Sequence, residues 1–476
     1  MRHHKNRHTT GRLLAAIVLT TIAWLVLRTW YIQGLARPVE IASGSMAPAL
    51  LGPHRKVTCD DCGFAFACGV ESLPRDQMAE CPNCGYARCD LSESVDLGGQ
   101  RMLVHRSSLV LQPPQRWETV VFRGPENASQ WFVKRVVGLP GESIQIRDGD
   151  VFIDGQIVRK TLAQQLAIAQ PVHDAAHRPG RQTRFPPRWR ADREETAWAH
   201  DESAWQCKAE SAEQIDWLTY RHLLRRHDDE NQWTEAAVND ASAYNQGQYP
   251  GRLNVSDLML SFTVTLQSCD ETDVGQVCNL PSHRRSRQVT NLPHENSQLR
   301  RGAGQLQIHA SDGRERFEAT ISPQTGTTVL SLNGEQVARS EAAVWPQETP
   351  LRVVLSMFDR KVLLARDDEV LIDTPFTQSD RPYQPTSRPL AIGCRGLHAQ
   401  ISQLRVDRDV YYRRPQGRHD RWAGRQPYTL DHNEYFVLGD NSQVSRDSRS
   451  WDASPALPAE LLVGRPLRFF SPRAGR

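Results

Sequence analysis

The sequence predicts a mainly β protein, and two observations favour this fold class. Short runs of β-branched and aromatic residues alternate with turns that contain glycine, proline or aspartate over much of the chain. Many of these runs follow one another at a spacing of about ten residues, which is typical of antiparallel sandwiches and barrels. The first 36 residues differ from the rest, because a basic segment there precedes an apolar one.

Length and composition limit the number of domains and the class of protein. The 476 residues allow about two to four domains with ordinary packed cores. The 58 basic and 55 acidic residues nearly balance, which argues against a nucleic-acid-binding protein. Glycine and proline occur 30 and 29 times, so the chain is neither collagen-like nor wholly disordered. Six of the ten cysteines, however, lie between residues 59 and 89, and such a cluster requires a local explanation.

Residues 1–36 predict a cytoplasmic basic tail and a membrane anchor. The apolar run, residues 13–27, is shorter than the roughly 20 residues that span hydrocarbon. Arg28 can snorkel, and the aromatic residues within 30–32 can lie at the membrane surface. A cleaved signal peptide is the alternative, although no small-x-small cleavage site follows closely. We expect an uncleaved single-pass helix with its N-terminus in the cytoplasm and the remaining chain outside.

Three segments share the strand-and-turn composition and are expected to form one discontinuous antiparallel β domain. They are residues 37–52, 98–158 and 429–476. Within the middle segment, several runs are typical of strands. These runs are residues 119–122, 131–133, 144–146 and 151–153, with turns at 138–141 and 148–150.

Insertions separate these segments. Residues 53–97 hold the cysteine cluster, and residues 159–245 have little periodicity and are expected to be irregular. Residues 246–428 contain further runs that are typical of strands, at 258–264, 305–308, 317–321, 328–332, 351–355 and 361–364.

This last insertion is predicted to be a β-sandwich or jelly roll. With residues 332–335, 367–371 and 400–406 it resembles concanavalin-A-like (laminin-G-like) modules. The resemblance leaves sugar binding, docking and a spacer role open. We expect residues of about 246–410 to fold on their own.

Candidate catalytic residues lie in the discontinuous domain. Ser43 and Ser45 flank a glycine about ten residues after the predicted membrane segment, and Lys134 interrupts a strongly apolar strand. A lysine buried in this way either snorkels or loses its charge, and a neutral lysine beside a serine can act as general base. Ordinary loop serines and a snorkelling lysine are the alternatives.

A third element, residues 435–441 followed by 445–449, strengthens the catalytic interpretation. Behind an apolar segment and in this order, the motifs resemble bacterial type I signal peptidase, the branch that uses a serine–lysine dyad. The resemblance covers roughly 150 of the 476 residues. The matching stretches are 43–48, 96–104, 120–122, 134–141, 439–449 and 463–467.

The resemblance implies a role for each matching residue. Ser45 is the nucleophile and Lys134 the base. The Ser43 hydroxyl joins the Ser45 backbone N–H in an oxyanion hole, and Ser445 orients the lysine. Supporting residues are Arg135, Gly439, Asp440, Asp447 and Arg449, of which the last two form an ion pair. The chain departs from the family pattern at Ala42, at Ala49 and at residues 442–444, which affects loop geometry rather than the dyad.

The same resemblance implies substrates, partners and location. The substrates are exported preproteins with small residues before the cleavage site, bound as an added strand. The lipid bilayer and the secretion translocon are the implied partners, and nucleic acid is not one. The chain is expected in the bacterial cytoplasmic membrane with its catalytic domain outside. Catalysis requires no cofactor.

The cysteine spacing predicts a structural zinc site. Cys59 and Cys62, and then Cys81 and Cys84, form two C-x2-C pairs separated by 18 residues, as in zinc ribbons. Disulfides are the alternative, because the segment is expected in an oxidising compartment. The remaining cysteines are candidates for such bonds, Cys68 with Cys89 (or as alternate ligands) and Cys269 with Cys278.

Two other functions are alternatives to a signal peptidase. A self-cleaving repressor-type protease also uses serine and lysine, but it would need a DNA-binding region where this chain has its apolar segment. A catalytically idle, membrane-anchored protein that binds through the inserted sandwich is the second. The joint presence of Ser45, Lys134 and Ser445 favours an active endopeptidase over both.

Overall fold

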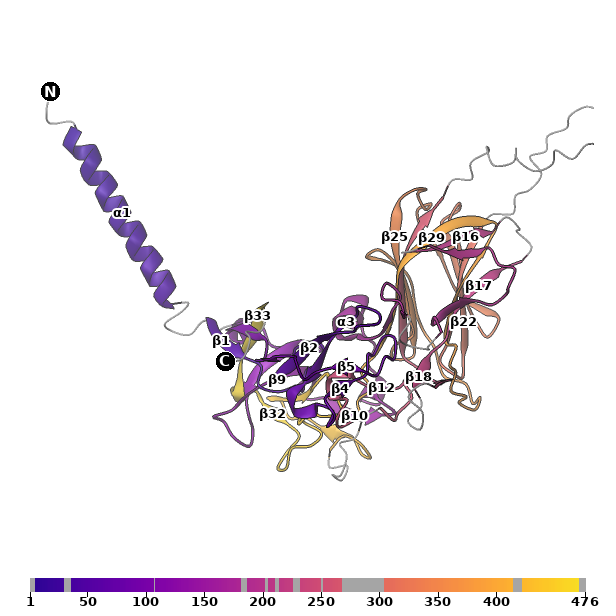
Figure 1. Cartoon of the computed structure of the whole chain (residues 1–476). Helices are drawn as coiled ribbons and strands as arrows, with labels where there is room; N and C mark the ends of the chain where they lie inside the picture. The colour runs from indigo at the N-terminus through magenta and orange to yellow at the C-terminus, as the bar shows by residue number, and fades with distance from the viewer. Residues whose placement is uncertain are drawn as a thin grey trace, which may run out of the picture.

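The computed structural model describes most of the chain and confirms a mainly β protein. The described residues are 5–29, 36–106, 108–180, 186–201, 204–209, 214–225, 232–249, 251–267, 304–413 and 422–470. Among them the α-helices are α1 (Lys5–Leu27), α2 (Ser108–Leu111) and α3 (Leu162–Ile168). Strands from distant parts of the chain lie side by side in every large sheet (Figure 1).

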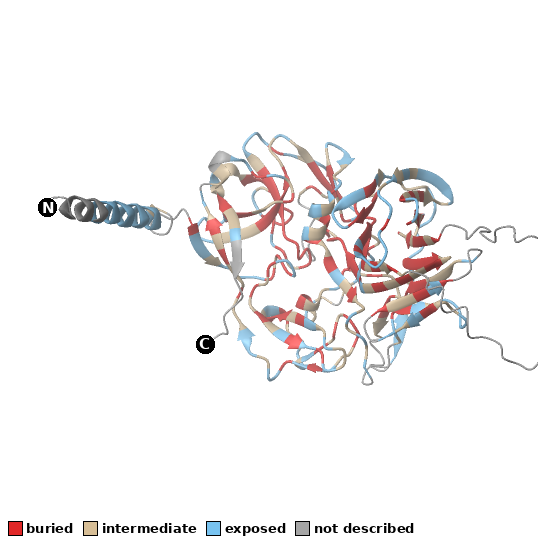
Figure 2. Cartoon of the chain, turned by 90° about the horizontal axis from the view of Figure 1, so that it is seen from above, coloured by how far each residue is buried: buried red, intermediate tan, exposed pale blue. Residues whose placement is uncertain are grey.

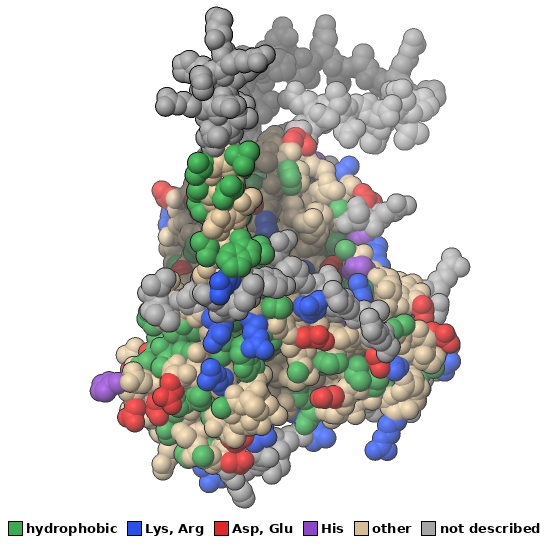
Figure 3. All heavy atoms as spheres, turned by 90° about the vertical axis from the view of Figure 1, so that its left-hand side faces the viewer, with side chains coloured by type: hydrophobic (Ala, Val, Ile, Leu, Met, Phe, Trp, Pro, Cys, Tyr) green, Lys and Arg blue, Asp and Glu red, His purple; other side chains and the backbone are tan. Residues whose placement is uncertain are grey.

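Helix α1 stands apart from the rest of the molecule (Figures 1 and 2). Its large apolar side chains from Leu13 to Leu27 are exposed, and they cover the helix in Figure 3. Across the described ranges, no helix is both long enough and apolar enough to cross a membrane. The predicted membrane span is therefore not supported, and residues 30–32 lie outside the described ranges.

The first large sheet is built from three separate stretches of chain, as predicted for a discontinuous domain. Its neighbouring strands are antiparallel along the order β1-β7-β33-β8-β9-β31-β32. Their bounds are β1 (Ala36–Glu40), β7 (Arg101–His105), β33 (Leu462–Phe470), β8 (Thr119–Arg123), β9 (Trp131–Gly138), β31 (Glu434–Leu438) and β32 (Leu457–Pro458). Strands β8, β9 and β31 carry the most buried side chains, since they lie inside the sheet.

A second, four-stranded sheet completes this part of the fold. It consists of β12 (Gln156–Ile157), β11 (Asp150–Ile153), β10 (Ser143–Arg147) and β30 (Tyr428–Thr429), in that order. The predicted turn between β10 and β11 is present, with Asp148 and Gly149 both at positive φ. Gly149 supplies the conformation at φ 93°, where a Cβ would also meet the ring of Tyr411.

The cysteine-rich insertion forms small sheets. One contains β3 (Ala65–Gly69), β2 (His54–Thr58) and β6 (Asp96–Leu97), and the other contains β4 (Met78–Ala79) and β5 (Cys89–Asp90). A short 3₁₀ helix, η2 (Val70–Ser72), follows β3. Phe66 and Leu91 join the buried cysteines in a compact cluster, so cysteine supplies much of this small core.

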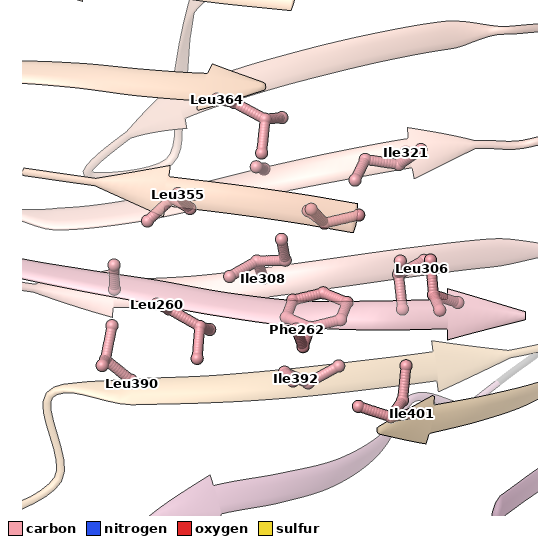
Figure 4. Close-up of a cluster of buried hydrophobic side chains, with 14 of the residues drawn as sticks. Leu260, Phe262, Leu306, Ile308, Ile321, Leu355, Leu364, Leu390, Ile392 and Ile401 are labelled. Atoms are coloured by element: carbon pink, nitrogen blue, oxygen red, sulfur yellow. The ribbon is translucent and has the colours of Figure 1, made fainter. Parts of the chain in front are cut away.

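Residues 159–428, called the second insertion from here on, contain two larger sheets that pack face to face around one apolar core (Figure 4). One sheet follows the order β15 (Trp198–His200), β16 (Trp205–Ala209), β29 (Leu397–Arg408), β20 (Leu258–Leu266), β25 (Pro350–Ser356), β26 (Lys361–Arg366) and β27 (Glu369–Pro375), with β13 (Gln170–Asp174) also paired to β29. The other follows β14 (Trp189–Ala191), β17 (Asp216–Tyr220), β28 (Leu390–Arg395), β21 (Gln305–Ser311), β22 (Arg316–Ser322), β23 (Thr327–Leu332) and β24 (Glu335–Glu341).

Some strands, such as β22, alternate between buried and more exposed positions, whereas β26 and β28 are buried almost throughout. Leu260 and Phe262 on β20 lie opposite Leu306 and Ile308 on β21 in the core (Figure 4). The strands predicted between residues 258 and 364 are all present. A further pair, β18 (Leu223–Arg225) and β19 (Trp233–Glu235), lies outside these sheets.

The expectation that residues 159–245 are irregular is wrong. Strands β13, β15 and β16 extend one sheet, and β14 and β17 extend the other. These strands have only three to five residues, too few for a clear period. Their alternation is also hidden because Trp189, Trp198 and Tyr220 point into the core from segments rich in polar residues.

This correction changes the expected limits of independent folding. A fragment of residues 246–410 would lack β13 to β17, which leaves β29 and β28 as open edges and removes part of the core. We expect residues 159–413 to show strand-rich circular dichroism and one cooperative urea transition. The shorter fragment should aggregate or unfold without a transition, and equal cooperativity in both fragments would contradict the assignment.

Candidate active site

The loop that contains Ser45 follows β1 and packs against the turn after β31. The Ala47 N–H donates to the Gly44 carbonyl at 3.0 Å, which closes a tight turn around the serine. From the other side, Asn441 donates its backbone N–H to the Ser45 carbonyl at 3.1 Å and its side-chain Nδ2 to the Gly44 carbonyl at 2.9 Å. Ser45 is thus fixed at its backbone while its side chain stays partly accessible.

Lys134 approaches this serine from the interior of β9. Its Nζ lies 2.5 Å from Ser45 Oγ, within hydrogen-bonding distance. The side chain is 1% exposed and pairs across the sheet with Val120 on β8. The sequence predicted both residues, and the fold brings them together across 89 positions of the chain.

Burial is the main electrostatic influence on Lys134. It lowers the pKa of the amine from 10.5 to about 8, because an ammonium loses its hydration inside the protein. Asp447 acts in the opposite direction and Arg449 in the same direction as burial. A substantial fraction of the amine is therefore neutral at slightly alkaline pH, as a general base requires.

The other two predicted serines differ in their contacts. Ser43 is exposed and donates its hydroxyl to Ser45 Oγ at 3.2 Å, so it lies beside the predicted nucleophile. Ser445 is 6% exposed, and its Oγ has no hydrogen-bond partner among the described residues. Its predicted contact with the Lys134 amine is not formed in this structure, and the orienting role stays a prediction.

Gly439 gives the serine loop room to approach. A Cβ at this position would lie 2.4 Å from the Ser45 carbonyl oxygen and 2.2 Å from Ser445 Oγ. The Gly439 N–H donates to Asp447 Oδ2 at 3.0 Å. Only glycine permits this close contact between the two loops.

Two buried ion pairs support the loops. Arg449 binds Asp447 through both carboxylate oxygens, at 2.9 and 2.7 Å. Burial alone would raise the pKa of Asp447, but Arg449, further hydrogen bonds and Lys134 together lower it. Arg135 binds Asp440 in the same two-pronged way, at 2.9 and 2.5 Å, and also donates to the Trp117 carbonyl at 2.7 Å. These four predicted supporting residues therefore stabilise the loops next to Ser45 and Lys134.

The sequence prediction missed Asn441 and two residues of the second insertion. Asn441 stood beside Gly439 and Asp440 in the matching motif but received no role. Tyr244 and Asn245, on the 3₁₀ helix η3 (Ala243–Asn245), contact the serine loop and Asn441. Nothing in their local sequence indicates a distant partner.

The four predicted zinc cysteines converge. All four Sγ atoms lie within 4.8 Å of one another. The Cys59–Cys84 and Cys62–Cys81 separations are 3.6 Å, close to the roughly 3.8 Å between sulfurs at the corners of a tetrahedron with 2.3 Å Zn–S bonds. Four convergent thiols are the donor set of a closed structural zinc site.

The backbone forms the same tight turn at each of the two C-x2-C pairs. The Gly63 N–H donates to the Cys59 carbonyl and the Gly85 N–H to the Cys81 carbonyl, both at 2.9 Å. Both glycines have positive φ, 71° and 77°, so each C-x2-C pair folds into the same tight knuckle.

Cys68 and Cys89 are not disulfide-bonded in this structure and do not belong to the four-sulfur group. Both are buried, and burial raises the pKa of the Cys68 thiol to about 12. The disulfide expected between them is therefore absent. Cys269 and Cys278 lie outside the described residues.

A cluster of carboxylates was not anticipated. The side chains of Asp150, Asp257 and Asp359 have oxygens within 4.8 Å of one another. Burial raises the pKa of Asp150 to about 7. Lys160 Nζ lies 2.5 Å from Asp359 and Arg360 Nε lies 3.8 Å from Asp150, so cations of this chain compensate the cluster. We assign no ligand to it.

A protein-family model matches more than half of this chain. The family model described as signal peptidase, peptidase S26, matches residues 90–200 and 329–470, which together exceed half of the chain. The chain belongs to the signal peptidase, peptidase S26 family. The first matched range contains Lys134 and the second contains residues 439–449, whereas Ser45 precedes both. The assignment of the nucleophile in this family member thus rests on the contact with Lys134.

Individual relatives in the S26 family match over shorter stretches. A probable signal peptidase I-1 of Synechocystis sp. is 37% identical over 65 residues, 12% of this chain and 33% of that protein. Signal peptidase I of Leptolyngbya laminosa is 37% identical over 71 residues, 13% of this chain and 35% of that protein. Signal peptidase I V of Bacillus subtilis is 32% identical over 68 residues, 14% of this chain and 39% of that protein. The chain thus spans about a third of the length of these relatives.

Solved structures resemble the chain only remotely. A carbohydrate-binding module from Bacillus subtilis matches with a TM-score of 0.27 and 8% identity, over 46% of this chain and 95% of the module. The carbohydrate recognition domain of Emp47p matches with a TM-score of 0.28 and 8% identity, over 51% of this chain and 96% of that domain. At these TM-scores the likeness supports no statement about fold or ligand.

We expect Lys134→Met to stabilise the protein at neutral pH. The folded-state pKa of about 8 is below the ordinary 10.5, so the folded chain binds fewer protons than the unfolded chain between these values, and wild-type stability rises with pH there. Below pH 8 the substitution should raise the free energy of unfolding by about 3 kcal/mol, and above pH 10.5 this gain should vanish. Urea unfolding of both proteins from pH 6 to pH 11 measures the difference.

Lys160→Met is the matched control. Lys160 is also fully buried, but its Nζ contacts Asp359 at 2.5 Å and Asp409 at 2.8 Å. Although burial opposes it, these carboxylates raise the pKa of Lys160. Its replacement leaves buried acids unpaired and should destabilise the protein at pH 7. Destabilisation by both substitutions at pH 6 would show that Lys134 is not carrying a desolvation cost.

Proposed function

We propose that this protein is a serine endopeptidase that removes signal peptides from exported preproteins. Ser45 is the nucleophile and Lys134 the general base. The observation that carries the proposal is the 2.5 Å contact between Ser45 Oγ and a fully buried lysine amine with a lowered pKa. Membership in the S26 family supports the same reaction class.

Each chemical step uses groups of this chain. The neutral Lys134 amine takes the proton of Ser45 as Oγ forms a bond to the carbonyl carbon of the scissile peptide. As the C–N bond breaks, the Lys134 ammonium returns that proton to the leaving amine, and an ester to Ser45 remains. A water molecule, deprotonated by the same lysine, then attacks the ester carbonyl; the bond to Ser45 Oγ breaks, the lysine ammonium returns the proton to Oγ, and the signal peptide leaves with a free carboxylate.

Charge that develops on the carbonyl oxygen requires donors. The Ser45 backbone N–H and the Ser43 hydroxyl supply them in our proposal, because Ser43 Oγ already lies 3.2 Å from Ser45 Oγ. When a substrate is bound, the Ser43 hydroxyl turns from Ser45 Oγ to the oxyanion. Ser445 completes the site by accepting a hydrogen bond from the lysine ammonium.

The substrate class follows from the same proposal. Signal peptides end in a small-x-small motif, and such a segment binds in extended form with its alternate side chains in shallow pockets. Attachment to the bacterial cytoplasmic membrane, with the bilayer and the translocon as partners, stays a prediction. A catalytically idle binding protein fits less well, since it has no need of a buried lysine at hydrogen-bonding distance from a serine.

We also propose one structural zinc ion, held by Cys59, Cys62, Cys81 and Cys84. The spacing of their sulfur atoms and the two glycine-containing knuckles support this ligand set. Bound zinc would fasten the two halves of the cysteine-rich insertion to one another. The ion takes no part in the reaction.

The activity is tested with a labelled preprotein and the purified chain in detergent. Ser45→Ala and Lys134→Arg should each lower cleavage by about 1,000-fold or more, because the first lacks the nucleophile and the second stays charged. Wild-type kcat/KM should rise with pH through a limb near 8, where Lys134 loses its proton. A preprotein with a bulky residue before the cleavage site is the control substrate. Near-wild-type cleavage by Lys134→Arg, with Ser45→Ala inactive, would refute the dyad but retain the serine.

The zinc site is tested by metal analysis of the full chain. We expect about one zinc per chain, lost in Cys62→Ser and in Cys81→Ser because three thiolates bind zinc more weakly than four. Cys68→Ser is the matched control, since Cys68 is buried like Cys81 and belongs to the same cluster but not to the ligand group, and it should retain the metal. A metal-free wild type that is folded and fully disulfide-bonded at these positions would rule out the site.

A further inference from the structure

The second insertion reaches into the active site through the short helix η3. Asn245, at the end of η3, is fully buried. Its Nδ2 donates to Asn441 Oδ1 at 2.7 Å and to Gln443 Oε1 at 2.9 Å, and its Oδ1 accepts from Asn441 Nδ2 at 2.9 Å. Residues 196 positions apart in the sequence thus form a reciprocal pair of amides.

This pair determines how Asn441 faces the serine loop. Asn441 uses Nδ2 to donate to the Gly44 carbonyl, and its backbone N–H donates to the Ser45 carbonyl. The side chain holds this orientation only if its Oδ1 meets a donor, and Asn245 Nδ2 is that donor. Without Asn245, Asn441 would bury an unsatisfied oxygen or turn away from Gly44.

Tyr244 adds a packing contact from the same helix. A Cβ on Gly44 would lie 2.1 Å from Tyr244 Cε1, and a Cβ on Gly69 would lie 2.3 Å from the same atom. The ring therefore rests directly against the glycine between the two serines. Its hydroxyl donates to the Pro53 carbonyl at 2.8 Å, which fixes the ring in place.

The insertion holds η3 in turn. Asp240, just before the helix, lies 3.4 Å from the Arg413 guanidinium, and Gln443 Nε2 donates to the Asp240 carbonyl at 2.5 Å. Arg408, at the end of β29, donates to the carbonyls of Asp240 and Ala241 at 3.2 and 3.1 Å. Gln443 belongs to residues 442–444, where the chain departs from the family pattern. Its side chain contacts both Asn245 and Asp240 of the insertion.

We propose that Asn245 is a positioning residue for the nucleophile, supplied by the insertion rather than by the discontinuous catalytic domain. Acting through Asn441, and together with Tyr244, it holds the serine loop where Ser45 Oγ meets Lys134 Nζ. The inference rests on the proposed function of Ser45. It makes the insertion a part of the catalytic unit.

The test compares Asn245→Ala and Asn245→Asp with wild type. Aspartate keeps the volume of asparagine but lacks both donors, so it also serves if the alanine variant fails to fold. We expect kcat for a labelled preprotein to fall by about 10- to 100-fold with KM nearly unchanged, as for loss of buried hydrogen bonds that orient a reacting group. The pH limb of Lys134 should shift as well, because Ser45 no longer contacts the amine. Amide hydrogen exchange at residues 44–46 and 441 should become faster.

Gln165→Ala is the matched control. Gln165 is another fully buried amide, bonded to Ser356 Oγ at 2.6 Å and to the Lys160 carbonyl at 3.3 Å. Its loss should lower the melting temperature without changing kcat, the pH limb or exchange at the serine loop. A merely structural role for Asn245 would give the same result as this control.

The outcomes separate the inference from the proposed function. Unchanged kcat and unchanged loop exchange in a folded Asn245 variant would overturn the inference while wild-type cleavage stands. If wild type and Ser45→Ala are equally inactive, the proposed function fails. The exchange arm then decides alone whether Asn245 holds the serine loop, since it needs no substrate.

Discussion

Removal of one lysine amine from water is the constraint on which the catalytic site depends. Desolvation brings the pKa of Lys134 to about 8, and without it the amine could not accept a proton from Ser45 near neutral pH. Such burial requires an interior strand, and β9 lies between β8 and β31 inside its sheet. The neighbours that enclose Lys134 on both sides thus come from two separate stretches of the chain.

Two carboxylates near Lys134 oppose the effect of burial on its pKa, and each of them is paired with an arginine. Asp440 and Asp447 both act to raise the pKa of Lys134. Arg135 binds the first and Arg449 the second through two-pronged ion pairs. The charge of Arg449 also acts directly to lower the pKa of Lys134. Asp440, Asp447 and Arg449 therefore influence the pKa of Lys134 in addition to shaping the loops.

The sequence predicted the parts of the site that have a local signal. A lysine within an apolar strand stands out because burial of its charge costs free energy. Cysteines in two C-x2-C pairs stand out because their spacing is that of a metal site. The longer strands of the second insertion were predicted from their runs of β-branched and aromatic residues between turns. Strands β14 to β17 and the contacts of Asn245 could not be predicted, since strands of three to five residues show no clear period and an amide pair across 196 positions leaves no trace in spacing. The predicted membrane span stays without support: its apolar run has only fifteen residues, and no helix among the described residues is long and apolar enough to cross a membrane.

The two insertions meet at the loop that contains Ser45. Tyr244 packs on Gly44 of the serine loop and on Gly69 of the cysteine-rich insertion, and both contacts allow no side chain beyond hydrogen. Gln170, at the start of β13, donates to the Asp440 carbonyl at 2.7 Å and so ties the second insertion to the turn beside the dyad. A change in the cysteine cluster would reach Ser45 by way of β3 and the tyrosine ring, whereas a change in the two-sheet core would reach it by way of Asn245. The position of a single hydroxyl thus depends on the folding of three separate parts of the chain.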